Sequence, residues 1–249
     1  AMKSVTYAIT AALALAGATA APSFAQNAMN AQPVELYACT FKEGKGFGDL
    51  ENANKDLKKW ASKHSRGYNA WMITPQFRAG EEAFDVGFIG AYANAEQFGS
   101  QMDKWVNESG DVSQAYVDAL DCSHGLMASY TVLPPEGGPG DGVVWFARCS
   151  LDDDSSMADA MAGHTTVSDM MVEMEAPGAS WMFAPSLGGG DAEFDYYHVA
   201  AWPSYPALGK AFEAYMNGGG IARANAAMDD VSHCSSPNLY DAVNIVAAP

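Results

Sequence analysis

The chain has 249 residues, and 49% of them are hydrophobic, which is enough apolar material for one large core or two small ones. Thirty acidic side chains against thirteen basic ones give a formal net charge of −17. This charge disfavours nucleic acids and anionic membrane surfaces as partners. It leaves two interpretations open: a highly solvated surface, or an acidic face for a cationic partner.

The N-terminus has the pattern of a secretory signal peptide. Met2-Lys3 forms a short positive region, an apolar, Ala-rich run follows, and small residues at Ser23 and Ala25 predict cleavage after Ala25. We expect residues 1–25 to be removed and the protein to be exported, to the periplasm or out of the cell. A membrane anchor is the alternative, but a polar segment at 26–32 follows the apolar run, so no membrane association is expected of the mature form.

The next hundred residues alternate between strand and helix patterns. Period-two alternation predicts strands at 34–41, 68–77, 83–93 and 122–133. Helical spacing of apolar residues predicts helices at 47–63 and from Asn94 onward, with further helical turns at 111–120. This order of elements is a split βαβ unit.

A Pro/Gly-rich linker at 134–142 ends this unit, and the pattern then restarts. Strands are predicted at 143–151, 180–187, 194–202 and 239–246, with helices at about 155–174 and 208–216.

The restart is an internal duplication with a constant offset of 110 residues. Residues 71–75 (WMITP) correspond to 181–185 (WMFAP), and Phe84-Asp85 corresponds to Phe194-Asp195. Identities kept at one offset over so long a stretch indicate a repeat. We therefore predict three parts after the signal peptide: a first repeat at 26–133, the linker at 134–142 and a second repeat at 143–249.

Four cysteines in an exported chain are candidates for two disulfides. Since Cys39 and Cys149 share the repeat offset, the duplication favours one bridge in each repeat, Cys39–Cys122 and Cys149–Cys234. A metal site is the rival interpretation. No CxxC or HxxxH spacing supports it, so no metal is expected.

In this arrangement each half-sheet has helices on one face and needs a partner for the other. At this point the chain resembles the dimeric α/β-barrel superfamily in its fused two-repeat form. The resemblance implies an α+β fold: a tandem duplication of a ferredoxin-like split βαβ unit, with two antiparallel four-stranded sheets facing each other as a pseudo-dimeric α/β barrel. Families with this fold include cofactor-independent monooxygenases, haem-dependent chlorite dismutases and dye peroxidases. The fold does not choose among them.

The third strand of each repeat carries aromatic residues on one face, and the repeats differ there. Phe88 of the first repeat corresponds to His198, and the second repeat also has Tyr196 and Trp202 on this face. We expect this face to point between the sheets and to form a ligand pocket in the second half. The alternative is a core histidine bonded to a neighbour.

Arg148 lies mid-strand beside Cys149 and requires an anionic partner, either a protein carboxylate or a ligand. If Arg148 shares a cavity with His198, a small anionic molecule is the expected guest.

His164 lies on an apolar helical stripe near several methionines, a pattern of core packing, with a copper site or an axial haem ligand as the rival. No CxxCH motif is present. We therefore expect no cofactor, with haem as the alternative.

Three functions remain open: binding of a small, partly apolar ligand, a cofactor-free or haem-dependent oxidoreductase, or a structural protein with a filled barrel. Whether the protein is an enzyme, and its oligomeric state, are not determined by the sequence.

Overall fold

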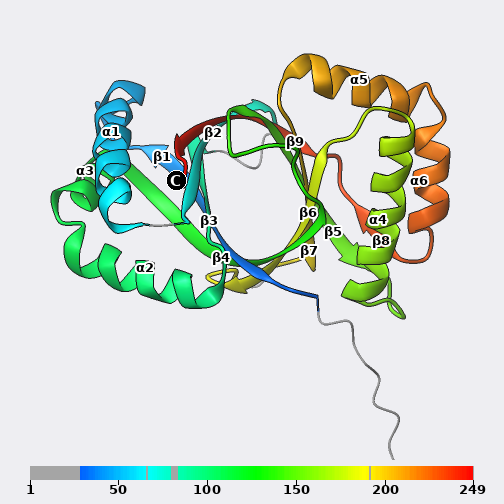
Figure 1. The fold of residues 1–249 in the computed structure, drawn as a ribbon, viewed down its shortest axis with the longest axis horizontal. Coiled ribbons are helices and arrows are strands. Elements are labelled where there is room, and N and C mark those ends of the chain that lie inside the picture. Colours follow the sequence, from blue (N-terminus) through cyan, green and yellow to red (C-terminus); the bar gives the residue numbers. More distant parts are fainter. Residues whose placement is uncertain (1–28, 66, 80–83, 191, 249) are drawn as a thin grey trace, which may run out of the picture.

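The computed structural model describes residues 29–65, 67–79, 84–190 and 192–248. Its fold is a closed β-barrel with helices packed on two opposite sides (Figure 1). The expected signal peptide, residues 1–25, lies outside the described residues. Within the described ranges, we find no helix with the length and apolar character needed to cross a membrane.

The first half follows the predicted order of elements. These are β1 (Gln32–Phe41), α1 (Phe47–His64), β2 (Asn69–Phe77), β3 (Val86–Ala91), α2 (Ala95–Glu108), α3 (Asp111–Ala119) and β4 (Leu120–Leu133). As predicted, Asn94 caps α2, because its side-chain oxygen accepts a hydrogen bond from the Gln97 backbone at 2.8 Å. β1 lies between β3 and β4, as the split βαβ topology requires.

The second half repeats this order, with its fourth strand divided into two. Its elements are β5 (Gly142–Leu151), α4 (Met157–Glu173), β6 (Ala179–Leu187), β7 (Tyr196–Trp202), α5 (Tyr205–Met216), α6 (Gly220–Met228), β8 (Ser232–Cys234) and β9 (Asn238–Val246). The sequence interpretation missed α6 and β8. The fourth strand is divided here because Pro237 lies between β8 and β9 and cannot donate a hydrogen bond to a ladder.

The two half-sheets join edge to edge into one antiparallel barrel. β4 pairs with β6 and β2 pairs with β9, while β5 pairs with β7 and closes the ring. β8 extends one side by pairing with β5. Closure removes the exposed sheet edges that would otherwise invite aggregation, and the predicted pseudo-dimeric barrel is confirmed.

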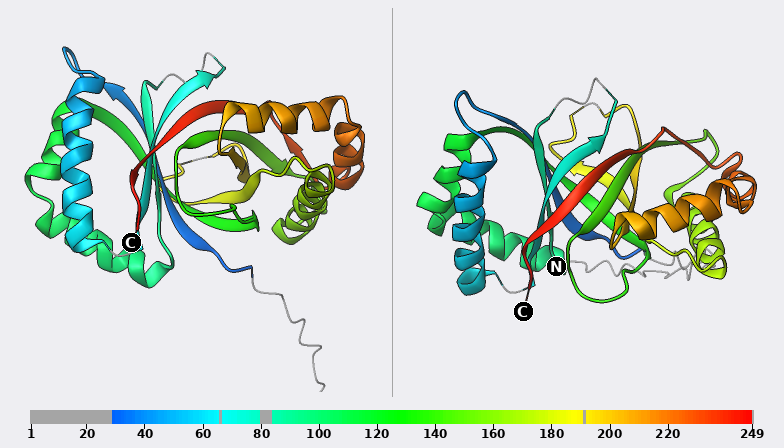
Figure 2. Two further views of the ribbon diagram at one scale, coloured as in Figure 1. Left: turned by 45° about the horizontal axis from the view of Figure 1, so that its top comes forward. Right: turned by 90° about the horizontal axis from the view of Figure 1, so that it is seen from above.

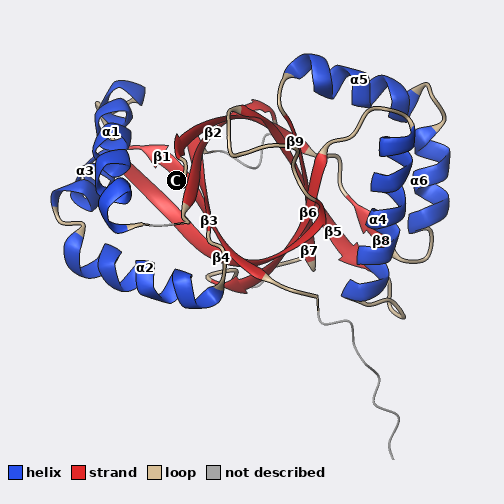
Figure 3. Ribbon diagram, viewed as in Figure 1, coloured by secondary structure: helices blue, strands red, loops and turns tan. Residues whose placement is uncertain are grey.

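The helices form two separate layers outside the barrel. Figure 2 and Figure 3 show α1, α2 and α3 on the side of the first half, and α4, α5 and α6 on the side of the second half. The barrel interior is an apolar core of Val34, Ile73, Met127, Val144, Phe183, Val199, Tyr240 and Ala242. An eight-stranded barrel has an interior just wide enough to be filled by its own side chains or to hold one small ligand.

The structure contains both predicted disulfides. Cys39 faces Cys122 across β1 and β4, and Cys149 faces Cys234 across β5 and β8. Each bridge closes a long loop, of 83 and 85 residues respectively. Such loops are long enough for a bridge to stabilise the fold by restricting the unfolded chain.

The repeated Phe-Asp pairs have the same structural role in both halves. The Asp85 carboxylate accepts a hydrogen bond from the Phe41 backbone at 2.8 Å, and the Asp195 carboxylate accepts one from Leu151 at 2.7 Å. Each carboxylate therefore satisfies a backbone donor at the end of the first strand of its repeat, which explains why this pair persists in both copies.

Candidate functional site

An apolar cavity of about 420 Å³ lies in the first half, on the helix-covered side of the sheet. Its walls come from α1, α2, α3 and the strands beneath them. The aromatic and aliphatic lining includes Leu57, Trp60, Tyr68, Phe88, Met102, Trp105, Tyr116 and Ile245. Concave sites of this size and character are typical of small-molecule binding.

Two carboxylates line this cavity: Asp121 is exposed, whereas Glu35 on β1 is only 2% exposed. Its Oε2 accepts a hydrogen bond from the Tyr92 hydroxyl at 2.6 Å, and its Oε1 accepts one from the Tyr37 hydroxyl at 3.2 Å. His124 Nε2 lies 2.9 Å from Oε1. A buried carboxylate needs such partners, because an isolated charge in an apolar setting is strongly unfavourable.

The tyrosines around Glu35 act as proton donors. Burial raises the pKa values of Tyr37, Tyr68 and Tyr92 well above the ordinary tyrosine range, and the negative charge of Glu35 adds to this effect for all three. Their hydroxyls therefore keep their protons at neutral pH, and Glu35 remains the acceptor of the cluster.

Gly90 on β3 leaves the space in which this cluster forms. A β-carbon at Gly90 would lie 2.7 Å from the Tyr68 hydroxyl oxygen and 3.2 Å from Glu35 Oε2. Any larger residue would have to displace one of these two side chains, so the glycine is part of the site.

The same place in the second half is filled by tryptophan. At the repeat offset of 110, Glu35 corresponds to Trp145 and Tyr92 to Trp202. The two indoles pack edge to face, with ring centroids 4.7 Å apart. Gly178 makes room for Trp202, since a β-carbon there would lie 2.5 Å from the indole nitrogen. One repeat therefore holds a cavity with a carboxylate, and the other holds an apolar plug.

A second cavity, of about 280 Å³, lies at the barrel and is lined in part by Tyr37, Phe88, His124 and Arg148. Tyr37 and Phe88 also line the first cavity. The ring of His124 stacks on that of Tyr37, with centroids 3.9 Å apart. His124 is 40% exposed, so it connects the buried Glu35 with the outside.

The expected orientation of the aromatic strand face was wrong. Val199 and Ile89, which lie on the opposite face of these strands, belong to the core inside the barrel. His198, Tyr196 and Trp202 instead point outward to the helices of the second half, where they pack near α4 and α5. None of these three lines either cavity. Their role as ligand-binding residues stays a prediction.

Two other predicted site residues do line cavities. Phe88 contacts both, and Arg148 lines only the barrel cavity, with its guanidinium carbon 5.7 Å from the centroid of the Phe194 ring. Arg148 is exposed on β5, so it is not the buried core arginine that we expected. It shares its cavity with His124 and not with His198.

His164 and His198 form a buried pair under α4. Their rings stack with centroids 4.2 Å apart. His164 Nε2 lies 3.0 Å from the Tyr196 hydroxyl, which in turn lies 2.6 Å from the Ser232 hydroxyl. Burial lowers the pKa of His164 to about 4. Burial, and then the neighbouring His164, lowers the pKa of His198 well below 6.5. Both rings are therefore neutral at pH 7.

Comparisons with solved structures find the same fold. A candidate monooxygenase from Lactobacillus acidophilus matches with a TM-score of 0.57 and 12% identity, covering 88% of this chain and 96% of that one. A candidate monooxygenase from Fusobacterium nucleatum matches with a TM-score of 0.55 and 8% identity, covering 88% and 94%. A candidate chlorite dismutase matches with a TM-score of 0.53 and 12% identity, covering 87% and 96%.

No protein-family model matches this sequence, and no curated protein matches it either. The solved structures share the dimeric α/β-barrel fold with this chain. At these identities they establish the fold alone.

These comparisons contradict the expectation that no cofactor is involved, because chlorite dismutases are a haem-dependent branch of this fold. We therefore tested the first cavity as a haem site. Its described lining includes no histidine, and its one cysteine, Cys122, is held in a disulfide. Its tyrosines are kept protonated by burial, whereas haem iron takes tyrosine as phenolate. The residues of this cavity do not fit haem, and no step is derived through it.

Proposed function

We propose that this protein is an exported oxidoreductase of the dimeric α/β-barrel type that binds its substrate in the first-half cavity against Glu35. The observation that carries the proposal is a carboxylate at 2% exposure on the wall of an apolar cavity of about 420 Å³. A buried carboxylate costs stability, so its presence on a cavity wall supports a functional role.

The chemistry of the cavity defines the substrate class. Apolar and aromatic walls favour a flat, largely aromatic molecule. Glu35 is a hydrogen-bond acceptor, so the substrate presents a donor such as a phenolic hydroxyl. An anionic guest would be repelled by Glu35, which favours a neutral molecule over the anionic ligand suggested by Arg148.

Glu35 is placed to accept a hydrogen bond from such a hydroxyl and to orient the molecule in the cavity. A hydrogen bond to a carboxylate increases the electron density on the ring, so the bound molecule is more easily oxidised than the free one. His124 contacts Glu35 and reaches the surface, so it links the buried carboxylate with solvent. Positioning and polarising a hydroxy-aromatic molecule is therefore the role assigned to this site.

Two disulfides favour an oxidising compartment, in agreement with the predicted signal peptide at 1–25. We place the mature protein in the periplasm or outside the cell. The proposed division into repeats at 26–133 and 143–249, with a linker at 134–142, follows the duplication.

The test compares two probes that differ only in a hydroxyl group, naphthol and naphthalene, by calorimetry or fluorescence. Glu35→Gln is expected to weaken naphthol binding about fivefold, because a neutral hydrogen bond is weaker than a charge-assisted one by about 1 kcal/mol. Naphthalene binding should not change. Glu51→Gln, the same substitution at an exposed position of α1, is the matched control.

Equal losses for both probes, or none, would show that Glu35 does not recognise the hydroxyl. Mass spectrometry of the protein isolated from its natural compartment, with an absorption spectrum, then identifies the natural guest. A guest that is bound and released unchanged under air would reduce the function to binding.

A further inference from the structure

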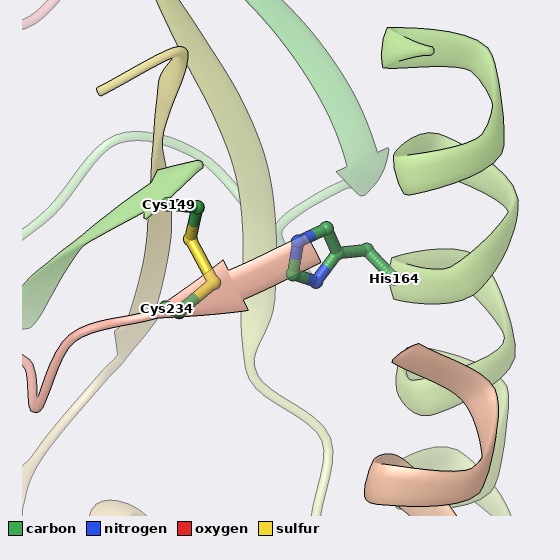
Figure 4. A group of neighbouring side chains, drawn as sticks. All are labelled: Cys149, His164 and Cys234. Carbon is green, nitrogen blue, oxygen red and sulfur yellow. A yellow bond between two sulfur atoms is a disulfide. The ribbon is translucent and has the colours of Figure 1, made fainter. Parts of the chain in front are cut away.

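Three side chains that bind transition metals converge in the second half. Cys149 on β5, Cys234 on β8 and His164 on α4 have ligand atoms that all lie within 4.8 Å of one another. Figure 4 shows the imidazole of His164 directed at the Cys149–Cys234 disulfide. Among the described residues this is the one group of three or more potential metal-binding side chains.

The first half has the equivalent disulfide without the histidine. At the repeat offset, His164 corresponds to Asn54. The Asn54 side chain accepts a hydrogen bond from the Tyr116 hydroxyl at 2.7 Å. Since both disulfides hold the same place in the fold, an imidazole is not needed for the structural role of the bridge. The second half therefore has a feature that the disulfide alone does not explain.

The local structure leaves room for the two sulfurs to separate. β8 has only three residues, and it is held to β5 by three residue pairs. In the first half, Cys122 lies within the continuous 14-residue strand β4. Zinc bonds of about 2.0–2.3 Å place tetrahedral ligands roughly 3.4–3.8 Å apart. Starting from atoms within 4.8 Å, small movements of β8 are sufficient.

We propose that Cys149, Cys234 and His164 form a zinc site that opens when their disulfide is reduced. A dithiol supplies two electrons and two protons and becomes a disulfide; a phosphine supplies the two electrons and becomes its oxide, with water providing the oxygen and the two protons. In either case the S–S bond breaks and two thiols form. Zinc then displaces both thiol protons and binds two thiolates and one imidazole, with water as the fourth ligand. An added small-molecule disulfide takes up the two electrons, becomes two thiols, re-forms the bridge and expels the metal.

The surroundings of His164 suit this role. Its Nε2 is engaged by the Tyr196 hydroxyl at 3.0 Å, and that hydroxyl is fixed by Ser232 at 2.6 Å. A hydrogen bond on the other nitrogen of a ligating histidine fixes the ring and increases its affinity for metal. Cys234 is exposed, so a reductant can reach the bridge.

Sequence spacing gave no sign of this site, because the ligands come from three elements separated by 15 and 70 residues. The prediction of no metal rested on the lack of CxxC and HxxxH motifs. It did not address ligands that tertiary structure brings together.

The first test uses the unmodified protein and needs no knowledge of its activity. The protein is reduced with a phosphine, incubated with or without zinc, alkylated with iodoacetamide and mapped by mass spectrometry. We expect zinc to protect Cys149 and Cys234 from alkylation while Cys39 and Cys122 react as before. Equal protection of the two pairs, or protection of neither, overturns the proposal.

The second test measures affinity with zinc and with cobalt as a coloured substitute. The reduced protein should bind one equivalent of metal. The oxidised protein should bind no metal with comparable affinity. His164→Asn, which installs the residue of the first repeat, should weaken binding by more than about 100-fold. Unchanged affinity in this variant overturns the proposal. Circular dichroism of the oxidised variant verifies that the variant folds. If the natural protein unfolds on reduction and takes up no zinc, the proposal is overturned as well.

Discussion

Glu35 shows how one residue can distinguish two copies of the same scaffold. Its carboxylate is buried with Tyr92, Tyr37 and His124 as partners, while the equivalent place in the second repeat holds Trp145. Replacing a carboxylate by an indole removes a buried charge and fills space. A duplicated barrel can therefore keep a polar cavity in one half and use the other half for stability.

The buried histidine pair gives the protein a stability that depends on pH. The pKa of His164 is about 4 in the folded protein, against about 6.5 in an unfolded chain. Between these values the unfolded chain binds a proton that the folded protein excludes, so stability is present above pH 6.5 and is lost as pH falls. We expect a loss on the order of 3 kcal/mol by pH 4 from His164, measured by urea unfolding across this range.

The matched control is the double variant His164→Asn/His198→Phe, which carries the residues of the first repeat at both positions. Its stability should fall less steeply between pH 6.5 and pH 4 than that of the natural protein. Parallel curves for the two proteins would show that the histidines are not responsible.

At the scale of elements, the turn before β6 is shaped by one contact. Gly178→Ala should destabilise the protein by about 1–3 kcal/mol, because the added β-carbon would lie 2.5 Å from the Trp202 indole nitrogen. Thermal or urea unfolding measures the change. Gly138→Ala, in the segment between β4 and β5, meets no atom within 4 Å and should be nearly neutral. Equal effects would mean that Trp202 moves aside freely.

The whole molecule is held together by pairing between its halves. β4–β6 and β2–β9 are hydrogen-bonded ladders that cross the repeat boundary, whereas both disulfides lie within a repeat. A protease site inserted at 134–141 should therefore give a nicked protein that still elutes as one particle in size-exclusion chromatography. Either repeat expressed alone would expose two sheet edges and should aggregate.

Mixing the two separately produced repeats during refolding provides the control for this prediction. Recovery of the particle from the two parts would confirm that the ladders are sufficient. Nicked halves that separate under non-denaturing conditions would instead show that the covalent linker holds the barrel together.

Much of the architecture followed from the sequence, because duplication is visible as identities at one offset. WMITP and WMFAP aligned the repeats, the alignment selected the disulfide pairs, and the order of strands and helices indicated the barrel. The candidate site did not follow. Glu35 shares its strand face with Cys39, a residue expected to be buried, and this was the signal that could have identified it. Only the tertiary structure shows the cavity beside it.

The sequence by itself determined the repeat, the order of elements and the pairing of cysteines, since these depend on local periodicity and on identities along the chain. Only the tertiary structure decided which strand face points into the barrel. Period-two alternation shows which residues share a strand face. When both faces are buried, it does not show which face points into the barrel. A closed eight-stranded barrel buries one face inside and the other under helices. Ile89 and Val199 pack in the narrow barrel interior. His198, Tyr196 and Trp202 lie on the opposite face and pack near α4 and α5.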